Sequence, residues 1–104
     1  MNVRVTETAN GKGLALVIGQ SFTVALPENP TTGYRWEFTK TGAPLCALLH
    51  DFFNANSGQV GGSGTHEWHF RAEQPGAATI EMQLTRGWDR AAATDSFMLR
   101  LHVT

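Results

Sequence analysis

Apolar and polar positions alternate along most of this 104-residue chain. The clearest example is the last segment, in which Phe97, Leu99, Leu101 and Val103 occupy every second position. Successive side chains of a β-strand point to opposite faces, so this pattern indicates strands that bury one face. After a short first strand with Val3 and Val5, we expect strands over residues 20–26, 34–40, 52–59, 65–72, 77–86 and 95–103.

The repetition of this pattern predicts the fold class. One-sided alternation occurs about seven times, which is typical of antiparallel sheets packed face to face. We therefore predict an all-β antiparallel sandwich of about seven strands, with residues 1–104 forming a single domain of ordinary size. The exception is the segment 43–54, which we expect to form an irregular helical turn that crosses between the sheets. Its apolar residues are Leu45, Leu48, Leu49 and Phe52.

The predicted order of strands brings three connections to one end of the sandwich. Successive connections of an antiparallel chain alternate between the two ends. The loops at residues 27–33, 58–64 and 86–94 are therefore expected together, and the turn at residues 74–76 at the opposite end. Binding residues favour loops that a rigid scaffold holds in place, so the end with the three loops is the candidate functional site.

The charge, hydropathy and cysteine content of the chain exclude several classes of binding partner and site. Eight Lys and Arg against nine Asp and Glu give a formal net charge of −1, which leaves no basic footprint for a nucleic-acid backbone. No apolar run approaches the ~18 residues that span a bilayer, so we expect no membrane partner. Cys46 is the one cysteine of the sequence, which excludes an internal disulfide and a zinc site built from paired cysteines.

The N-terminal residues bear on the compartment. The first residues enter the alternating pattern directly, without the basic segment and apolar stretch of a signal peptide. We therefore expect either an intracellular protein or the mature form of an exported one, and both alternatives stay open.

The segment His66-Glu67-Trp68-His69 resembles a shortened metalloprotease motif. That motif needs two histidines at i and i+4 on one helix face, whereas residues three apart on a strand face opposite sides. We therefore expect His66 on the inner face with Trp68 and Phe70, His69 on the outer face with Glu67, and no metal site.

No combination of residues indicates catalysis. Cys46 lies in an apolar run, where a buried and inert thiol is the usual outcome. Thr31 and Thr32 have no neighbouring base that would activate a hydroxyl nucleophile. The glycine-rich segment 58–64 precedes a strand and lacks the Lys-Ser/Thr ending of a phosphate-binding loop. We predict no catalytic residue, no cofactor and no enzyme activity.

Three short segments at the predicted loops carry a family resemblance. Residues 29–34 read Asn-Pro-Thr-Thr-Gly-Tyr, residues 61–65 read Gly-Gly-Ser-Gly-Thr, and residues 86–88 read Arg-Gly-Trp. In this order they resemble the motifs of the chagasin-like inhibitors of papain-family cysteine proteases, and the likeness covers nearly the whole chain. Ser63 and Gly87 depart from the family's Gly-x-Gly-Gly and Arg-Pro-Trp patterns, which have glycine and proline there.

The resemblance implies an immunoglobulin-like β-sandwich that is a reversible, tight-binding inhibitor of papain-like cysteine proteases. In such relatives the first loop enters the active-site cleft, while the other two grip its flanks. Here the 29–33 loop is therefore expected to occlude the cleft of a cathepsin-like protease, with a monomer of this chain as the binding unit. The protease-binding residues that the resemblance implies are Asn29, Pro30, Thr31, Thr32, Gly33, Tyr34, Gly61, Gly62, Ser63, Gly64, Arg86, Gly87 and Trp88.

The residue types of the first loop suit this use. Pro30 fixes one backbone angle and holds Asn29 extended, so the loop loses little entropy on binding. Asn29 can bond its own loop backbone in an Asx turn, and Gly33 permits the return turn. Thr31 and Thr32 are small enough to enter a slot beside a catalytic thiolate.

The other two loops are expected to act differently. Gly62 and Gly64 would contribute backbone contact and shape, so a bulky residue at either position would weaken binding without unfolding the sandwich. Trp88 is of the residue type that dominates interface energetics, followed by Arg86.

Less specific interpretations stay open. The Pro-Thr-Thr-Gly run fits an ordinary tight turn, and Trp88 fits a core position at the end of the sandwich. Arg86 or Arg90 fits a loop salt bridge with Asp89 that contributes little. A non-inhibitory immunoglobulin-like adhesion or assembly module is the second functional class.

Overall fold

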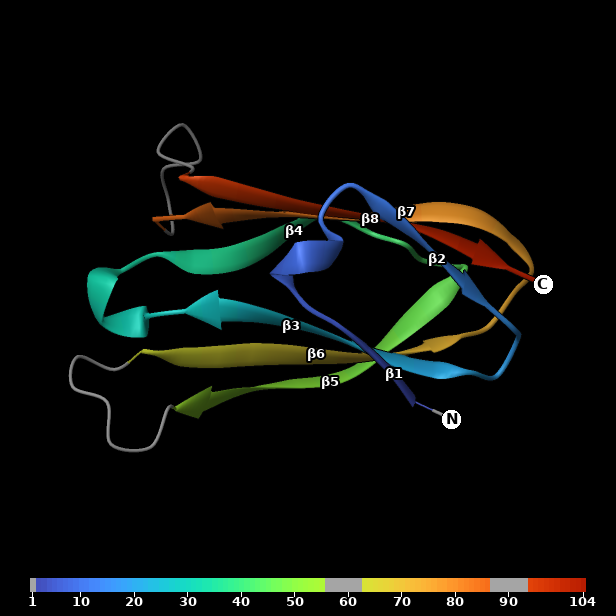
Figure 1. Cartoon of the computed structure of the whole chain (residues 1–104), viewed down its shortest axis with the longest axis horizontal. Coiled ribbons are helices and arrows are strands. Elements are labelled where there is room, and N and C mark those ends of the chain that lie inside the picture. The colour runs from blue at the N-terminus through green and yellow to red at the C-terminus, as the bar shows by residue number, and fades with distance from the viewer. Residues whose placement is uncertain (1, 56–62, 87–93) are drawn as a thin grey trace.

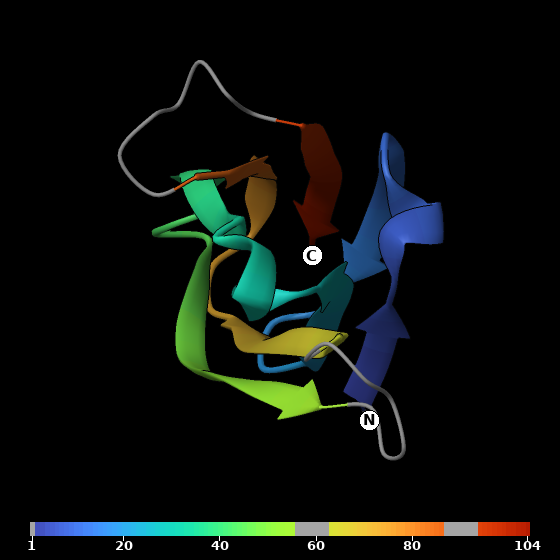
Figure 2. The ribbon, with the colours of Figure 1, turned by 90° about the vertical axis from the view of Figure 1, so that its left-hand side faces the viewer.

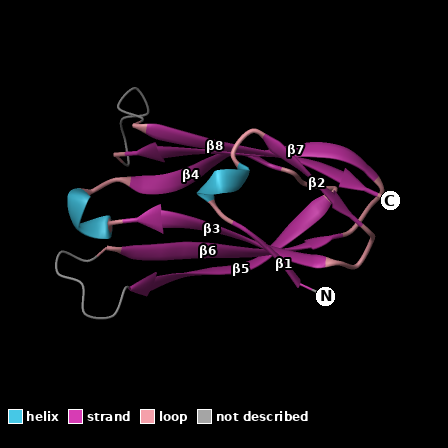
Figure 3. Ribbon diagram, viewed as in Figure 1, coloured by secondary structure: helices cyan, strands magenta, loops and turns pink. Residues whose placement is uncertain are grey.

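The chain folds almost entirely into strands. The computed structural model describes residues 2–55, 63–86 and 94–104, where a pair of short 3₁₀ helices accompanies the strands (Figure 3). None of the helices found there is long or apolar enough to cross a membrane. The elements are β1 (Asn2–Val5), η1 (Glu7–Ala9), β2 (Lys12–Leu16), β3 (Ser21–Glu28), η2 (Pro30–Thr32), β4 (Arg35–Thr41), β5 (Cys46–Ala55), β6 (Gly64–Ala72), β7 (Gly76–Thr85) and β8 (Asp95–Val103).

These strands form two four-stranded sheets that face each other (Figures 1 and 2). One sheet has the order β1-β3-β6-β5 and the other β2-β8-β7-β4. The predicted sandwich is therefore confirmed, but its purely antiparallel pairing is wrong. β1 runs parallel to β3, and β2 runs parallel to β8. Both parallel pairs lie at a sheet edge, and alternation specifies which face a strand buries but not the direction of its neighbour.

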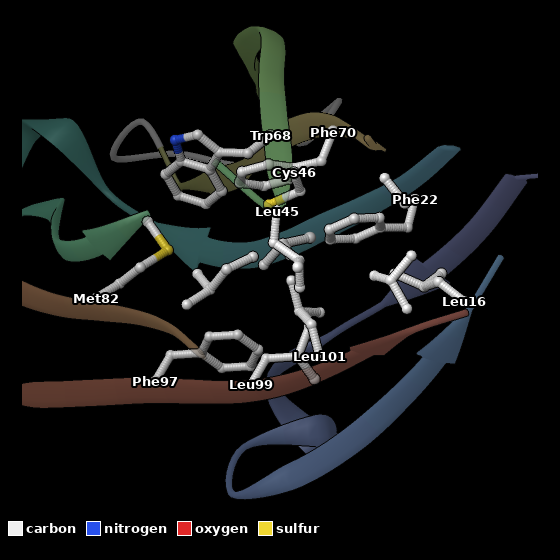
Figure 4. Close-up of a cluster of buried hydrophobic side chains, with 14 of the residues drawn as sticks. Leu16, Phe22, Leu45, Cys46, Trp68, Phe70, Met82, Phe97, Leu99 and Leu101 are labelled. Atoms are coloured by element: carbon white, nitrogen blue, oxygen red, sulfur yellow. The ribbon is translucent and has the colours of Figure 1, made fainter. Parts of the chain in front are cut away.

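The core lies between the two sheets, where the sequence pattern places it. The four inward residues predicted for the last strand are each at most 2% exposed. Phe22 and Phe70 stack across β3 and β6 with ring centroids 5.0 Å apart. Figure 4 shows side chains from both sheets, among them Phe70 and Leu99, filling the space between the layers. Burial of these apolar side chains is the main favourable term that holds the sheets together.

The prediction of a helical turn over residues 43–54 is wrong. Cys46–Ala55 is strand β5, which pairs with β6 and begins well before the predicted residue 52. Its register shifts between Leu48 and His50, as in a β-bulge, and the extra residue breaks the period of two. The expected crossover is real but shorter, because the chain changes sheets in the turn that the Leu45 N–H closes on the Gly42 carbonyl at 3.0 Å.

The strand ends that border the three loops lie at one end of the sandwich, as the sequence predicts (Figure 1). Gly64 pairs with both Glu28 and Ala55. In the other sheet, Arg35 at the start of β4 pairs with Thr85 at the end of β7. The neighbouring residue Leu84 of β7 pairs with Asp95 at the start of β8. The turn at residues 74–76 lies at the opposite end. The scaffold thus holds the first loop between the bases of the other two.

Candidate functional site

The first loop is braced by its own asparagine. Asn29 Oδ1 accepts hydrogen bonds from the backbone N–H of Thr31 at 3.1 Å and from the Thr31 hydroxyl at 2.5 Å. The first of these bonds closes the Asx turn that the sequence predicts. Thr31 is exposed at this end of the molecule, so the bond shapes a projecting loop rather than a buried one.

The second half of the loop is equally connected. The backbone N–H and the hydroxyl of Thr32 both donate to the Asn29 carbonyl, at 3.1 and 2.8 Å. The Tyr34 N–H then donates to the Thr32 hydroxyl at 3.3 Å. Gly33 lies between them with φ of +84°, a conformation that L side chains rarely adopt. Its predicted role in the return turn is confirmed, and the loop has a defined shape before any partner arrives.

The bases of this loop are joined across the two sheets. β3 and β4 flank the loop but belong to different sheets, so no ladder of backbone hydrogen bonds connects them. The Trp36 N–H instead donates to Glu28 Oε2 at 2.9 Å, and the Trp36 indole N–H donates to the Pro27 carbonyl at 2.9 Å. Trp36 thereby ties the start of β4 to the end of β3.

A histidine between two carboxylates lies next to this tie. His66 Nδ1 is 2.8 Å from Glu28 Oε1, and His66 Nε2 is 2.6 Å from Asp51 Oδ2. The ring of His66 stacks on Trp68 with centroids 4.0 Å apart and planes 1° from parallel. The Glu28 side chain is 1% exposed, whereas that of Asp51 is 46% exposed. The trio joins β3, β6 and β5 directly behind the first loop.

The pKa values of Glu28 and His66 both shift toward the charged forms. Burial alone would raise the pKa of Glu28, but hydrogen bonds from His66 and the Trp36 N–H, together with the charge of His66, lower it. Burial alone would lower the pKa of His66, but its hydrogen bonds and attraction to Glu28 and Asp51 raise it. The geometry therefore favours a charged pair inside the end of the sandwich.

Sequence reasoning did not single out Glu28, although a signal was present. The inward series of β3 continues from Leu26 to Glu28, and the inward series of β6 reaches His66 after Phe70 and Trp68. A carboxylate and an imidazole on inner faces of two strands are candidates for pairing, because a buried charge needs a partner. Only the register between the strands shows that they meet.

The third loop is linked to the first through Arg86. Its guanidinium carbon lies 5.3 Å from the centroid of the Tyr34 ring, a cation–π distance. The structure thus brings together Arg86 and Tyr34, two of the predicted site residues. The suggested salt bridge of Asp89 with Arg86 or Arg90 involves residues outside the described segments of the chain.

The predicted residues of the second loop behave differently from one another. Ser63 is half-buried, and it lines a hollow of about 400 Å³ together with parts of the first loop and the start of β8. Gly64 is a buried member of β6, not a loop residue. A Cβ there would clash with the Asn54 carbonyl oxygen and would lie 2.9 Å from the Ala55 Cα. The expectation that a bulky residue at Gly64 would spare the fold is therefore wrong.

Four further predicted site residues lie outside the residues that the structure describes. They are Gly61, Gly62, Gly87 and Trp88.

The residues considered for catalysis or metal binding pack within the strands of the sandwich. Cys46 is 2% exposed, and burial raises the pKa of its thiol to about 11, so it is poorly suited to act as a nucleophile. His66 and His69 lie on opposite faces of β6, as predicted: His66 stacks on Trp68, and His69 stacks on His50. Within the described residues, no three His, Cys, Asp or Glu are arranged to hold a metal ion.

Comparison with known proteins assigns the family. Residues 15–103 match the model described as chagasin family peptidase inhibitor I42. The chain belongs to the chagasin family of peptidase inhibitors. Chagasin of Trypanosoma cruzi is 29% identical over 93 residues, which cover 85% of this chain and 84% of that protein. The resemblance seen in the loop motifs is thus confirmed.

Solved structures confirm the fold. The cysteine protease inhibitor EhICP2 of Entamoeba histolytica superposes with a TM-score of 0.88 at 22% identity, covering 99% of this chain and 96% of that one. Amebosin gives a TM-score of 0.82 at 23% identity, covering 100% and 99% of the two chains. PbICP-C, solved in complex with falcipain-2, gives 0.55 at 16% identity, covering 100% and 88%. As a member of this family the chain is a peptidase inhibitor and not an enzyme, as predicted.

Proposed function

We propose that this chain is a reversible, tight-binding inhibitor of papain-like cysteine proteases that occludes the active-site cleft with its 29–33 loop. The observation that carries the proposal is the internally bonded Asn29–Thr31–Thr32 turn, which projects from a rigid sandwich end. The family supplies the class of target, since EhICP2 is described as a cysteine protease inhibitor and PbICP-C was solved with falcipain-2. The strand ends that border the 58–64 and 86–94 loops lie at the same end of the sandwich as the first loop (Figure 1), and the proposal assigns these two loops to the flanks of the protease cleft.

Occlusion of this kind relies on shape that exists before binding. Each backbone segment that is ordered in the free inhibitor avoids some of the entropy cost of association. The four hydrogen bonds among Asn29, Thr31 and Thr32 supply that order. Small exposed threonines at the tip fit a narrow slot beside a catalytic thiolate. The same proposal includes contacts with the flanks of the protease cleft, made by Ser63 in the second loop and by Arg86 and Trp88 in the third.

Titration of active papain tests the function. The inhibitor is expected to abolish hydrolysis of a peptide substrate at a near-stoichiometric amount, and gel analysis after prolonged incubation is expected to show it uncleaved. Competition with substrate should be reversible on dilution. A chain that neither inhibits papain and a cathepsin nor survives them would contradict the proposal and favour an adhesion or assembly module.

Replacement of Cys46 by serine is expected to leave inhibition unchanged. The thiol is buried near the opposite end of β5 from the loops, where it pairs with Ala72, and steric occlusion forms no covalent bond. The inhibition constants of both proteins for papain, measured with matched thermal melts, provide the check. Papain whose catalytic cysteine carries a small blocking group is expected to bind both forms. Loss of inhibition by a folded Cys46→Ser protein would indicate thiol chemistry instead.

A further inference from the structure

The Glu28 carboxylate provides one of the two hydrogen bonds that join β3 to β4 at the base of the first loop, and the Pro27 carbonyl provides the other. Oε2 receives the Trp36 N–H from β4, while Oε1 faces His66 on β6. With its side chain 1% exposed, the carboxylate is shielded from the solvent that would otherwise replace a lost partner. Its position therefore depends on both His66 and Trp36, and through Trp36 it helps to set the separation of the two strand ends.

The hydrogen-bond geometry identifies the protonation state of His66. A neutral imidazole has one N–H and one acceptor nitrogen, whereas the imidazolium has two N–H groups. Both ring nitrogens of His66 face carboxylate oxygens, at 2.8 and 2.6 Å. An ionised carboxylate only accepts hydrogen bonds. Both contacts are satisfied at once when His66 carries both protons and a positive charge.

We infer that the Glu28–His66 ion pair positions the 29–33 loop for its target, so that the inhibitor binds more tightly at acidic than at alkaline pH. The inference rests on the proposed function, because the loop it controls is the one proposed to enter the protease cleft. Glu28 and His66 are positioning residues, since they lie behind the loop and act through Trp36.

The charged groups around the pair support its response to pH. Glu28 from β3 and Asp51 from β5 face the imidazole from the two strands that flank β6. From the opposite sheet, Arg35 attracts Glu28. The pKa of His66 is raised and that of Glu28 is lowered. Ordinary values are about 6.5 for histidine and about 4.3 for glutamate, so both groups are charged throughout the range between them.

The direction of the effect follows from these shifts. A raised pKa means that protonated His66 stabilises the fold and the loop base fully below about pH 6.5. This contribution is lost as the pH rises through the pKa of His66 in the folded protein. The neutral imidazole has only one N–H, so one of the two carboxylates then faces the lone pair of a ring nitrogen. Buried Glu28 also loses the positive charge of His66. The hydrogen bond from the Trp36 N–H to Glu28 then weakens. The 29–33 loop is less ordered before binding, and ordering it during binding lowers the affinity.

The experiment compares the inhibitor with its His66→Gln variant on papain from about pH 5 to about pH 9. The ratio of the two inhibition constants at each pH cancels the ionisations of the protease. Near pH 5 the variant is expected to bind about tenfold more weakly, the cost of ordering a loop or a few side chains. The ratio should approach one as the pH rises through the His66 titration. A ratio that stays constant over the whole range overturns the inference.

Asp51→Asn is a second variant that keeps the hydrogen-bond acceptor and removes one charge. Asp51 is nearly half exposed on the edge strand β5, so the core stays intact even if His66→Gln fails to fold. Without this negative charge His66 is expected to lose its proton more easily. The midpoint of the fall in affinity with rising pH is therefore expected to move to lower pH, by roughly half a unit or more. His102→Gln is the matched control, since His102 is exposed on β8 toward the other end. An unmoved midpoint in Asp51→Asn overturns the inference.

A measurement without protease separates this inference from the proposed function. In an NMR titration, the amide signals of Thr31 and Thr32 are expected to shift with the midpoint of the His66 imidazole. If the inhibitor fails on papain at every pH, the proposed function is wrong, and this titration still decides whether the pair positions the loop. Loop amides that ignore the titration of His66 overturn the positioning role.

Discussion

Replacement of Gly64 by alanine is expected to destabilise the sandwich by about 3 kcal/mol and to lower the melting temperature by about 15 °C. The added Cβ would collide with the backbone of β5, at the Asn54 carbonyl and at the Ala55 Cα. Backbone in a paired sheet cannot move aside without losing ladder hydrogen bonds between β5 and β6. Thermal denaturation of the free inhibitor measures the effect.

Gly13→Ala is the matched control for this change. Gly13 is also a strand glycine, in β2, but a Cβ there would meet only the Arg100 carbonyl oxygen at 3.8 Å, an ordinary contact. Its effect on the free energy of unfolding is expected to stay within about 0.5 kcal/mol. Equal melting temperatures for the Gly64 and Gly13 variants would show that Gly64 serves the interface rather than the strand.

The strand faces were predictable from sequence because alternation is a local property. In β8 every apolar residue of the inward series is buried, and the bounds 95–103 agree with the structure. The same reasoning failed for β5, since its bulge between Leu48 and His50 puts apolar residues at a spacing that resembles a helix. Leu48, Leu49 and Phe52 are also 42–44% exposed at the sheet edge, so burial did not enforce a clean pattern.

The same distinction applies to the site. The Asx turn at Asn29 and the positive φ of Gly33 depend on neighbouring residues, and the Asn-Pro-Thr-Thr-Gly sequence was sufficient to predict them. The pairing of Glu28 with His66 spans 38 positions and depends on the register of β3 against β6. The crowding at Gly64 depends on the approach of β5. Such contacts follow from tertiary packing, which no short motif encodes.

Replacement of Trp88 by alanine is expected to raise the dissociation constant of the complex with papain about 30-fold. An aromatic anchor buried at an interface is commonly worth about 2 kcal/mol or more, and about 1.4 kcal/mol corresponds to a factor of ten. Trp88 lies two positions after Arg86, which packs on Tyr34 at the end of the first loop. Titration of papain and of a cathepsin with the variant, after a thermal melt has verified its fold, measures the effect.

Thr31 provides the contrasting case, because its proposed role is to fit a slot rather than to anchor the complex. In Thr31→Ala the Asn29 side chain keeps the backbone N–H of residue 31 as a donor, so affinity is expected to fall at most about threefold. Thr31→Arg should cost far more than this, since a slot beside the catalytic thiolate cannot widen cheaply. Equal binding by Trp88→Ala and the parent, together with a lower melting temperature, would place Trp88 in the core and remove it from the protease-binding residues.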